Sequence, residues 1–349
     1  MLKSKEGRNQ MQRKKMKVNF ISPLMEKIAH QLGVEIHIEP KYKYVGQIVL
    51  PNGTKRYFRS TRFDLNTLGA TEIARDKSYA SYFMHLMGYP VPEGQEFFTN
   101  HWAEVIRNKR NPLAAYDYAK KLGLPVIVKP NTKSQGSGVA KVYNKREFMQ
   151  AVNQCKDNVF LVQRVAVGND YRIVVLDDRV ISAYQRFPLS VTGDGRNSIL
   201  KLLLKKQQEF NRQDRDTIIP IDDIRIKRSL KRLGLTMDSV PQKKEGVELL
   251  ANANLSTGGD AIDVTKRLHL AWKKLAIQLT RDMGLRYCGV DVMVQGTLIE
   301  PPQSFVVIEI NAAPGIDNYA SMGEEQRQIV EEMYTDVFKA MLQNNAFPN

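Results

Sequence analysis

Three oxygen-bearing side chains near the end of the chain could hold a cation. Asp291 lies in the apolar run 289–294, and Glu309 and Asn311 lie in the apolar run 306–311. Residues two apart on a β-strand project from the same face, so Glu309 and Asn311 are expected side by side. If the two runs form a hairpin around residues 295–304, its register sets Asp291 opposite Glu309.

Opposed carboxylates on neighbouring strands repel each other unless a positive charge lies between them. An all-oxygen set of two carboxylates and an amide suits a hard divalent cation, and magnesium fits it best. The alternative is a pair of strands whose few polar residues face solvent.

A loop of glycines and small polar residues, 130–139, follows a predicted strand that ends at Lys129. Glycine lets backbone amides approach phosphate oxygens closely, and a lysine at the strand end adds a point charge. The loop is not a Walker A motif, which would end in Gly-Lys-Ser/Thr and open a helix. A phosphate grip and an ordinary hairpin turn both remain open for this loop.

Two predicted strands, 159–175 and 180–186, carry charges among apolar residues. Asp170 and Arg172 lie on the first and Arg186 on the second. Buried charge is costly unless it is paired. These three side chains should therefore pair with one another or meet an anion.

The elements that position these residues read as an α/β chain. Residues 17–94 predict a small module with strands at 18–21 and 34–38, a helix at 23–32, a hairpin of 46–50 with 56–59 turning at Asn52-Gly53, and a helix at 71–87. Lys77 lies within the last helix and, from the sequence alone, is an exposed helix lysine. Further helices are predicted at 112–122, 145–154, 268–283 and 324–342.

Composition indicates a soluble globular protein, because 42% of the 349 residues are hydrophobic and 26% are charged. The chain has neither an apolar run long enough to cross a bilayer nor a signal peptide. Cys155 and Cys288, the only cysteines, form no metal or disulfide pattern. A reducing cytoplasm is therefore the expected compartment.

The net charge is +15, and residues 1–17 supply +6 of it through seven Lys and Arg against one Glu. This tail and the basic stretch 225–232 could face nucleic acid or another acidic partner, but a solvated tail and a solvated helix face are the commoner arrangements. No zinc spacing, RNA-binding aromatic box or DNA-binding helix pair occurs. We therefore expect no nucleic-acid partner and no membrane, and leave a homo-oligomer open.

Taken together and in this order, the motifs resemble the ATP-grasp superfamily of carboxylate–amine ligases. The likeness covers roughly residues 68–315, and the segments 252–265 and 311–315 resemble the ATP-grasp half of cyanophycin synthetases most. They are less similar to the glutathione-synthase half of bifunctional glutathione enzymes. The resemblance implies an ATP-grasp fold: two α/β subdomains that clasp ATP, here preceded by a small α/β domain.

The resemblance also implies roles for individual residues. ATP would be bound by Lys77, Lys129, Asp170 at the ribose, the backbone from Gln163 to Val165 at adenine, and the loop residues Gln135, Gly136 and Gly138. Two magnesium ions, with manganese as an alternative, would bind Asp291, Glu309 and Asn311. Arg172 and Arg186 would be catalytic, stabilising an acyl phosphate and a tetrahedral oxyanion. The carboxylate substrate would be held by Asn254, Ser256, Thr257, Gly258 and Gly259.

The expected activity is ATP-dependent formation of an amide or peptide bond between an amino-acid or peptide carboxylate and an amine. The alternative is a nucleotide-binding partner or tailoring protein that keeps the fold without turnover. Gln163 stands where the family has an acid, which changes little if the backbone makes the adenine contacts. Departures from the family at 211–215 and 316–319 leave the substrates open. The expected organisation is a disordered basic tail at 1–16, an N-terminal domain at 17–105, a subdomain with the glycine loop at 106–165, and a C-terminal subdomain at 166–349.

Overall fold

The computed structural model describes residues 21–133, 136–213, 215, 217–315, 317–320 and 322–343. The chain divides into two compact units, unit 1 with Met1–Asp64 and Val330–Asn349, and unit 2 with Leu65–Ile329. Most of the C-terminal helix, from Val330 onward, thus groups with the start of the chain, whereas residues 65–105 belong to unit 2. None of the helices in the described ranges is long and apolar enough to cross a membrane.

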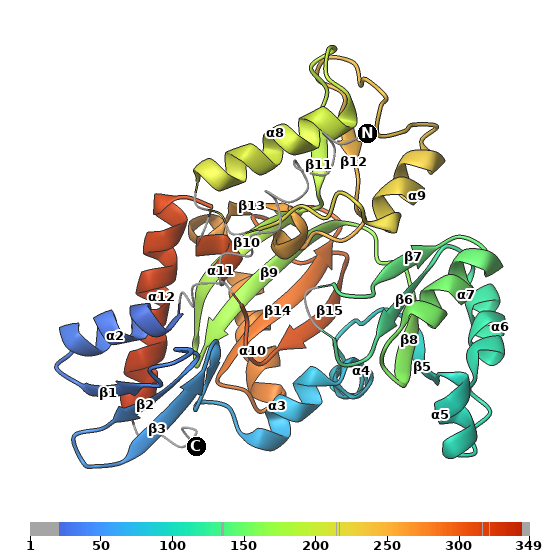
Figure 1. Ribbon diagram of the computed structural model, residues 1–349. Helices are drawn as coiled ribbons and strands as arrows, with labels where there is room; N and C mark the ends of the chain where they lie inside the picture. The colour runs from blue at the N-terminus through green and yellow to red at the C-terminus, as the bar shows by residue number, and fades with distance from the viewer. Residues whose placement is uncertain are drawn as a thin grey trace. The chain divides into compact units, whose positions relative to one another are not determined.

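Unit 1 is a four-stranded antiparallel sheet with helices against one face (Figure 1). Its elements are α2 (Ile21–Gln31), β1 (Glu35–Ile38), β2 (Val45–Val49), β3 (Lys55–Arg59), β4 (Arg62–Phe63) and most of α12 (Glu324–Leu342). The rings of Phe63 and Tyr334 pack with centroids 5.6 Å apart. The predicted Asn52-Gly53 turn is confirmed, with Gly53 at a φ of +80°. Of the predicted strand 18–21, only Ile21 is described, and it begins α2.

Unit 2 contains a five-stranded sheet, a four-stranded sheet and a two-stranded sheet; the five-stranded and four-stranded sheets are here called the larger and the smaller sheet, and the smaller one holds the predicted glycine loop. Its strands pair in the order β5 (Gly94–Phe98), β8 (Val159–Arg164), β6 (Val126–Pro130), β7 (Ala140–Val142). Helices α5 (Asn100–Val105), α6 (Pro112–Leu122) and α7 (Lys145–Gln154) accompany it (Figure 1). Phe148 of α7 and Phe160 of β8 are fully buried in their common core. The predicted helices 112–122 and 145–154 are confirmed.

The larger sheet has the strand order β13 (Asp260–Asp263), β10 (Arg179–Phe187), β9 (Asn169–Leu176), β14 (Tyr287–Val294), β15 (Phe305–Asn311). Helices α3 (Leu68–Arg75), α4 (Lys77–Leu86) and α10 (Leu270–Asp282) accompany it. Trp272 of α10 shares a core with Ile173 and Val290. Side chains alternate along a strand, so Arg172 and Asp291 project from the opposite face. One face is thus apolar and covered, and the other is free for polar residues.

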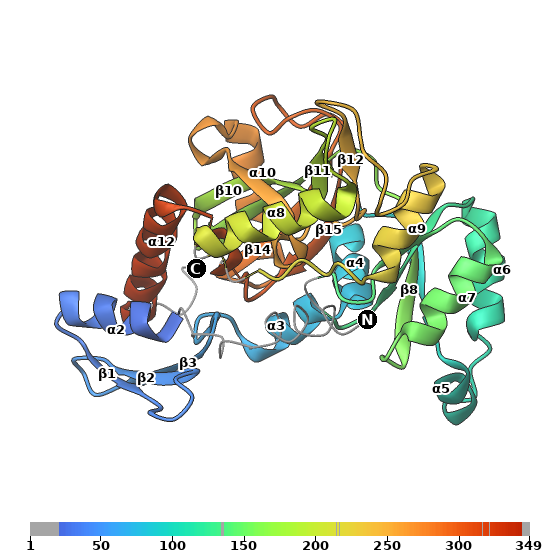
Figure 2. The same ribbon diagram turned by 45° about the horizontal axis from the view of Figure 1, so that its top comes forward.

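An insertion, residues 189–250, connects β10 to β13. It contains β11 (Ser190–Thr192), α8 (Ile199–Arg212), α9 (Ile224–Arg232) and β12 (Gly246–Glu248), with α8 and α9 in front in Figure 2. Leu203, Phe210, Ile226 and Leu230 form a separate hydrophobic cluster within it. The short helices η1 (Leu255–Thr257), η2 (Thr265–Arg267) and α11 (Asp317–Ala320) complete unit 2.

Candidate active site

A line of polar residues crosses all five strands of the larger sheet. Asp291 pairs with Glu309 on one side and with Arg172 on the other. Tyr184 in turn lies between Arg172 and Asp263. Because directly paired residues project from the same face, these five side chains form one continuous row, here called the polar row.

The predicted hairpin register is confirmed where it matters, since Asp291 lies opposite Glu309. Asn311 Nδ2 donates to Glu309 Oε1 at 3.0 Å, which places the two on one face as expected. A register symmetric about the hairpin would pair Val292 with Ile308, but a β-bulge pairs it with Val307 instead. The bulge lies directly beside Asp291, a position at which such irregularities re-aim side chains.

Two arginines and two aspartates form a buried ionic network on this face. Arg172 donates from Nε and Nη2 to the two oxygens of Asp291, at 2.6 and 2.7 Å. Arg186 donates from Nε to Asp170 Oδ1 at 2.8 Å, and its Nη2 lies 3.1 Å from Asp291 Oδ2. Of the two alternatives left open for Asp170, Arg172 and Arg186, mutual pairing holds for Arg186 with Asp170, whereas Arg172 meets another anion, the carboxylate of Asp291.

The surroundings of the two aspartates shift their pKa values in opposite directions. Burial alone would raise the pKa of Asp291, but Arg172 and Arg186 hold it below its ordinary value. Burial raises the pKa of Asp170 to about 6 despite Arg186, and the neighbouring charge of Asp291 adds to the rise. Asp291 is thus the firmly ionised member of the network.

Two lysines face this network from the other side of the site. Lys129, the fourth residue of β6, is only 5% exposed, and burial lowers its pKa to about 8, with Glu309 opposing the shift and Lys77 adding to it. Lys77 Nζ lies 3.6 Å from Glu309 Oε2 and donates to the carbonyl of Lys133 at 2.6 Å. Lysines from β6 and α4 therefore converge with a carboxylate from β15.

The single predicted helix 71–87 is wrong, because it is broken at Asp76 into α3 and α4. Lys77 is consequently the first residue of α4, with a side chain only 12% exposed rather than solvated. Asn131, which follows β6, accepts from the backbone N–H of Ser78 and donates to Asp76 Oδ2. This amide ties the start of α4 to the end of β6. Asp76 as a helix-capping residue before Lys77 was the missed sequence signal.

The glycine loop is a tight turn packed against the segment 252–254. Val139 N donates to the carbonyl of Gly136 at 3.2 Å, with Gly136 and Gly138 at φ of +63° and +75°. Glycine is favoured at 136 by its positive φ, and a side chain there would also displace the amide of Asn254. Gln135 and the preceding serine lie outside the described residues.

The predicted adenine hinge, 163–165, spans the end of β8. Gln163 is buried, and Gly94 on the neighbouring strand leaves the room that its side chain fills. Val165 lies just beyond the strand, and its N–H and C=O make no hydrogen bond within the described ranges. Val165 therefore has backbone groups free for a ligand.

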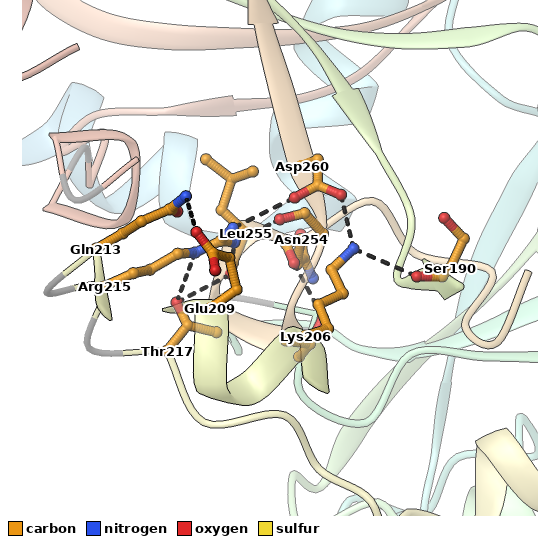
Figure 3. A network of polar contacts seen from close by, with 11 residues as sticks. Ser190, Lys206, Glu209, Gln213, Arg215, Thr217, Asn254, Leu255 and Asp260 are labelled. Atoms are coloured by element: carbon orange, nitrogen blue, oxygen red, sulfur yellow. Dashed lines mark hydrogen bonds and ion pairs between the residues drawn. The ribbon is translucent and has the colours of Figure 1, made fainter. Parts of the chain in front are cut away.

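The loop from Asn254 to Gly259 is held from within and by Arg215 (Figure 3). Arg215 is 3% exposed and donates to the carbonyls of Leu255 and Gly259 and to Asp260 Oδ1. The backbone N–H groups of Thr257 and Gly259 both donate to the carbonyl of Asn254. Amide groups that were expected to converge on a substrate carboxylate are therefore already used.

Gly258 also has a different reason to be glycine than expected. Its φ is +96°, its N–H donates to Leu255, and a side chain there would press on Leu189 and Ile219 in the insertion core. Ser256, in contrast, is half-buried, and within the described chain its hydroxyl has no partner. Of the loop residues named from the sequence, Ser256 is the one best placed to contact a ligand.

Sequence reasoning missed the far end of the polar row. Tyr319 stacks on Tyr184 with centroids 4.6 Å apart and planes 12° apart, and its hydroxyl donates to Asp263 at 2.8 Å. Tyr184 is two residues before Arg186 on one strand, so the same-face rule could have identified it. Asp263 and Tyr319 carried no local signal, because only the strand order brings them together.

Comparisons with known proteins agree with this geometry. Residues 242–332 match the RimK-like ATP-grasp domain, and residues 83–192 match the D-ala D-ala ligase C-terminus. The chain is 34% identical over 241 residues to the glutathione biosynthesis bifunctional protein GshAB of Mannheimia succiniciproducens, covering 65% of this chain and 30% of that protein. It is 31% identical over 266 residues to cyanophycin synthetase of Trichormus variabilis, covering 74% and 28%.

In fold, the chain is similar to a crystal structure of a bifunctional glutathione synthetase from Pasteurella multocida. The TM-score is 0.55 at 24% identity, over 91% of this chain and 44% of that one. The chain belongs to the ATP-grasp family of carboxylate–amine ligases, whose members use ATP with Mg²⁺. It spans about a third of the length of these curated relatives.

Proposed function

We propose that this protein is an ATP-dependent ligase that joins an amino-acid or peptide carboxylate to an amine through an acyl phosphate, releasing ADP and phosphate. The observation that carries the proposal is the polar row, with Glu309, Asp291 and Arg172 on one sheet and Lys129 approaching from the other. Moving a phosphoryl group onto a carboxylate brings anion to anion, so clustered cations are what the step requires.

Lys77 and Lys129 would neutralise the phosphates of ATP, and the free backbone groups of Val165 would bind adenine. Asp170 uses only Oδ1 for Arg186, which leaves Oδ2 for a ribose hydroxyl. Arg172 and Arg186 each commit Nε and Nη2 to an aspartate. Arg186 therefore keeps Nη1, and Arg172, which also shares a hydrogen bond with Tyr184, keeps its remaining N–H groups for the acyl phosphate and for the oxyanion that forms when the amine attacks.

The oxygen donors fit magnesium. A carboxylate offers about four lone-pair sites, and the arginines occupy three of those of Asp291, which leaves one for a cation. Glu309 is the more accessible carboxylate, with 22% of its side chain exposed, and Asn311 adds an amide oxygen. The described residues contain no cluster of three or more His, Cys, Asp or Glu, so this mixed set is the candidate. Bound there, magnesium would shield the transferring phosphoryl group.

ADP release across amino acids and dipeptides, with mass detection of products, tests the proposal. Hydroxylamine in the same reactions should trap the acyl phosphate as a hydroxamate, even where the natural amine is missing from the panel. ATP binding with neither ADP nor hydroxamate for any acid would instead support a nucleotide-binding protein without turnover. If the protein does not bind ATP at all, both the ligase proposal and the nucleotide-binding alternative are contradicted.

A further inference from the structure

The basic helix α9 is not simply a solvated face. Arg225, Arg228 and Arg232 recur at the spacing that places side chains on one side of a helix. Arg228 donates to Gln150 at 2.6 Å, and Arg232 pairs with Glu147 at 3.4 Å, both on α7 of the smaller sheet. The helices lie close together in Figures 1 and 2. Lys227 and Lys231 are exposed, as expected of a solvated face, and Arg232 is exposed but paired, whereas Arg225 and Arg228 are partly buried.

The guanidinium of Arg225 is fixed on one side and directed at the glycine loop on the other. Its Nε and Nη2 donate to Asp223, at 3.0 and 2.7 Å, and Asp223 also caps α9. Its Nη1 lies 3.4 Å from the carbonyl of Gly136 and 3.3 Å from that of Val139. Arg225 therefore holds the carbonyls at both ends of the turn.

This contact acts together with the turn hydrogen bond from Val139 to fix the direction of the Gly136 carbonyl, and so of the amide that follows it. In a trans peptide the C=O of one residue and the N–H of the next point in opposite directions. The bond after Gly136 is trans, so turning its carbonyl to Arg225 turns the N–H of Ser137 the opposite way. That N–H makes no hydrogen bond within the described ranges. A carbonyl turned to the same side would instead repel phosphate oxygens.

We propose that Arg225 is a positioning residue for the phosphates of ATP: it holds the glycine loop from behind, so that amides rather than carbonyls face the nucleotide. This inference rests on the proposed nucleotide site. It also links the insertion to both loops of the site, because Arg215 of the same insertion holds the loop from Asn254 to Gly259.

The test compares the Kd values of the full chain for adenosine, ADP and ATP with Mg²⁺, measured by calorimetry. Arg225→Ala should raise the Kd of ATP and ADP at least about fivefold, because the loop amides lose their orientation, while adenosine binds as before. Arg225→Lys should recover part of the affinity, since an ammonium can still reach one carbonyl. Lys227→Ala removes the same charge from the exposed side of α9 and should change nothing.

Asp223→Asn, which frees Arg225 without removing it, should weaken ATP in the same direction and so provides a second variant. An equal loss for adenosine and ATP would show a general structural defect and overturn the inference, as would an Arg225→Ala protein that behaves like Lys227→Ala. Lys129→Ala distinguishes a failure of this inference from a failure of the proposed nucleotide site. If it weakens ATP while Arg225→Ala does not, only the inference fails; if neither does, the nucleotide site itself is misplaced.

Discussion

Lys129 is a buried cation whose charge depends on pH. Its pKa of about 8 lies below its ordinary value of 10.5, because burial disfavours the ammonium form. In the free protein it therefore loses its proton as the pH rises through 8, and binding phosphates then requires a proton to be taken up. We expect the affinity for ATP to fall by up to about tenfold per pH unit above 8. Calorimetry between pH 7 and 9.5 measures this.

Lys129→Arg should flatten this pH dependence, since arginine keeps its charge throughout the range. Lys129→Ala should remove it as well and, in addition, cost roughly a hundredfold in rate. A wild-type ATP affinity that does not change with pH, together with an unaffected alanine variant, would show that Lys129 is an ordinary strand residue with no part in ATP binding.

Glu309 tests the metal site. Glu309→Gln keeps the size of the side chain but removes the charge, so ligation should be abolished while the unfolding temperature stays near that of the wild type. Glu300→Gln makes the same change in the exposed loop of the same hairpin and is the matched control. Normal turnover of the Glu309 variant at limiting magnesium would refute the assignment.

Ser256 tests the substrate loop more sharply than its glycines do. Ser256→Ala should raise the KM for the carboxylate substrate roughly tenfold, the cost of one hydrogen bond to a charged group, and leave the ATP affinity unchanged. Thr257→Ser keeps the bond to the carbonyl of Asn254 and is the control. Gly258→Val should instead reduce stability, because of its positive φ and its contacts with Leu189 and Ile219. An unchanged KM in Ser256→Ala would remove the loop from the substrate site.

At the scale of elements, the contact between the end of β6 and the start of α4 positions Lys77 of the candidate site. Asn131→Ala removes the amide that links Asp76 and Ser78. It should weaken ATP binding in the way that Lys77→Ala does, and the two changes together should cost less than their sum, because both act through the same ammonium group. Independent, additive losses in a double-mutant cycle would mean that Asn131 does not position Lys77.

Elements with a clear period or cap could be predicted from the sequence. The helices 112–122, 145–154 and 324–342 were predicted with their bounds, and the facing of Asp291 and Glu309 followed from the hairpin symmetry. The β-bulge after Asp291 could not be foreseen, because apolar β-branched residues fill both possible registers. The break at Asp76 was missed because apolar residues continue through it at helical spacing.

At the scale of the whole molecule, sequence order does not predict spatial neighbours. Tyr184 meets Asp263 and Tyr319 only because β13 adds to the sheet beside β10. The only signal in the sequence of the insertion was a run of basic residues, and their partners Gln150 and Glu147 lie far away in the chain. Long-range contacts of this kind determine which charged side chains are solvated and which form contacts within the protein.

The division into units also predicts how damage spreads. Phe338 is fully buried on the part of α12 that belongs to unit 1. Phe338→Ala should leave a cavity that costs about 3 kcal/mol or more. Hydrogen exchange should then speed up in residues 21–64 but not in β9 and β10. The neighbouring exposed Lys339→Ala is the control, and equal acceleration in both units would contradict their independence.

The polar row exists only while the five strands keep their register, so the proposed chemistry depends on strand alignment rather than on any one residue. Strands lie about 4.8 Å apart, so the four gaps from Glu309 to Asp263 set the ends of the row roughly 19 Å from each other. Sliding one strand by a single residue would turn its member of the row toward the helices and bring an apolar side chain into its place. Insertions in the hairpin loop 295–304 leave the alignment intact, whereas a single extra residue inside β14 breaks the row at its centre.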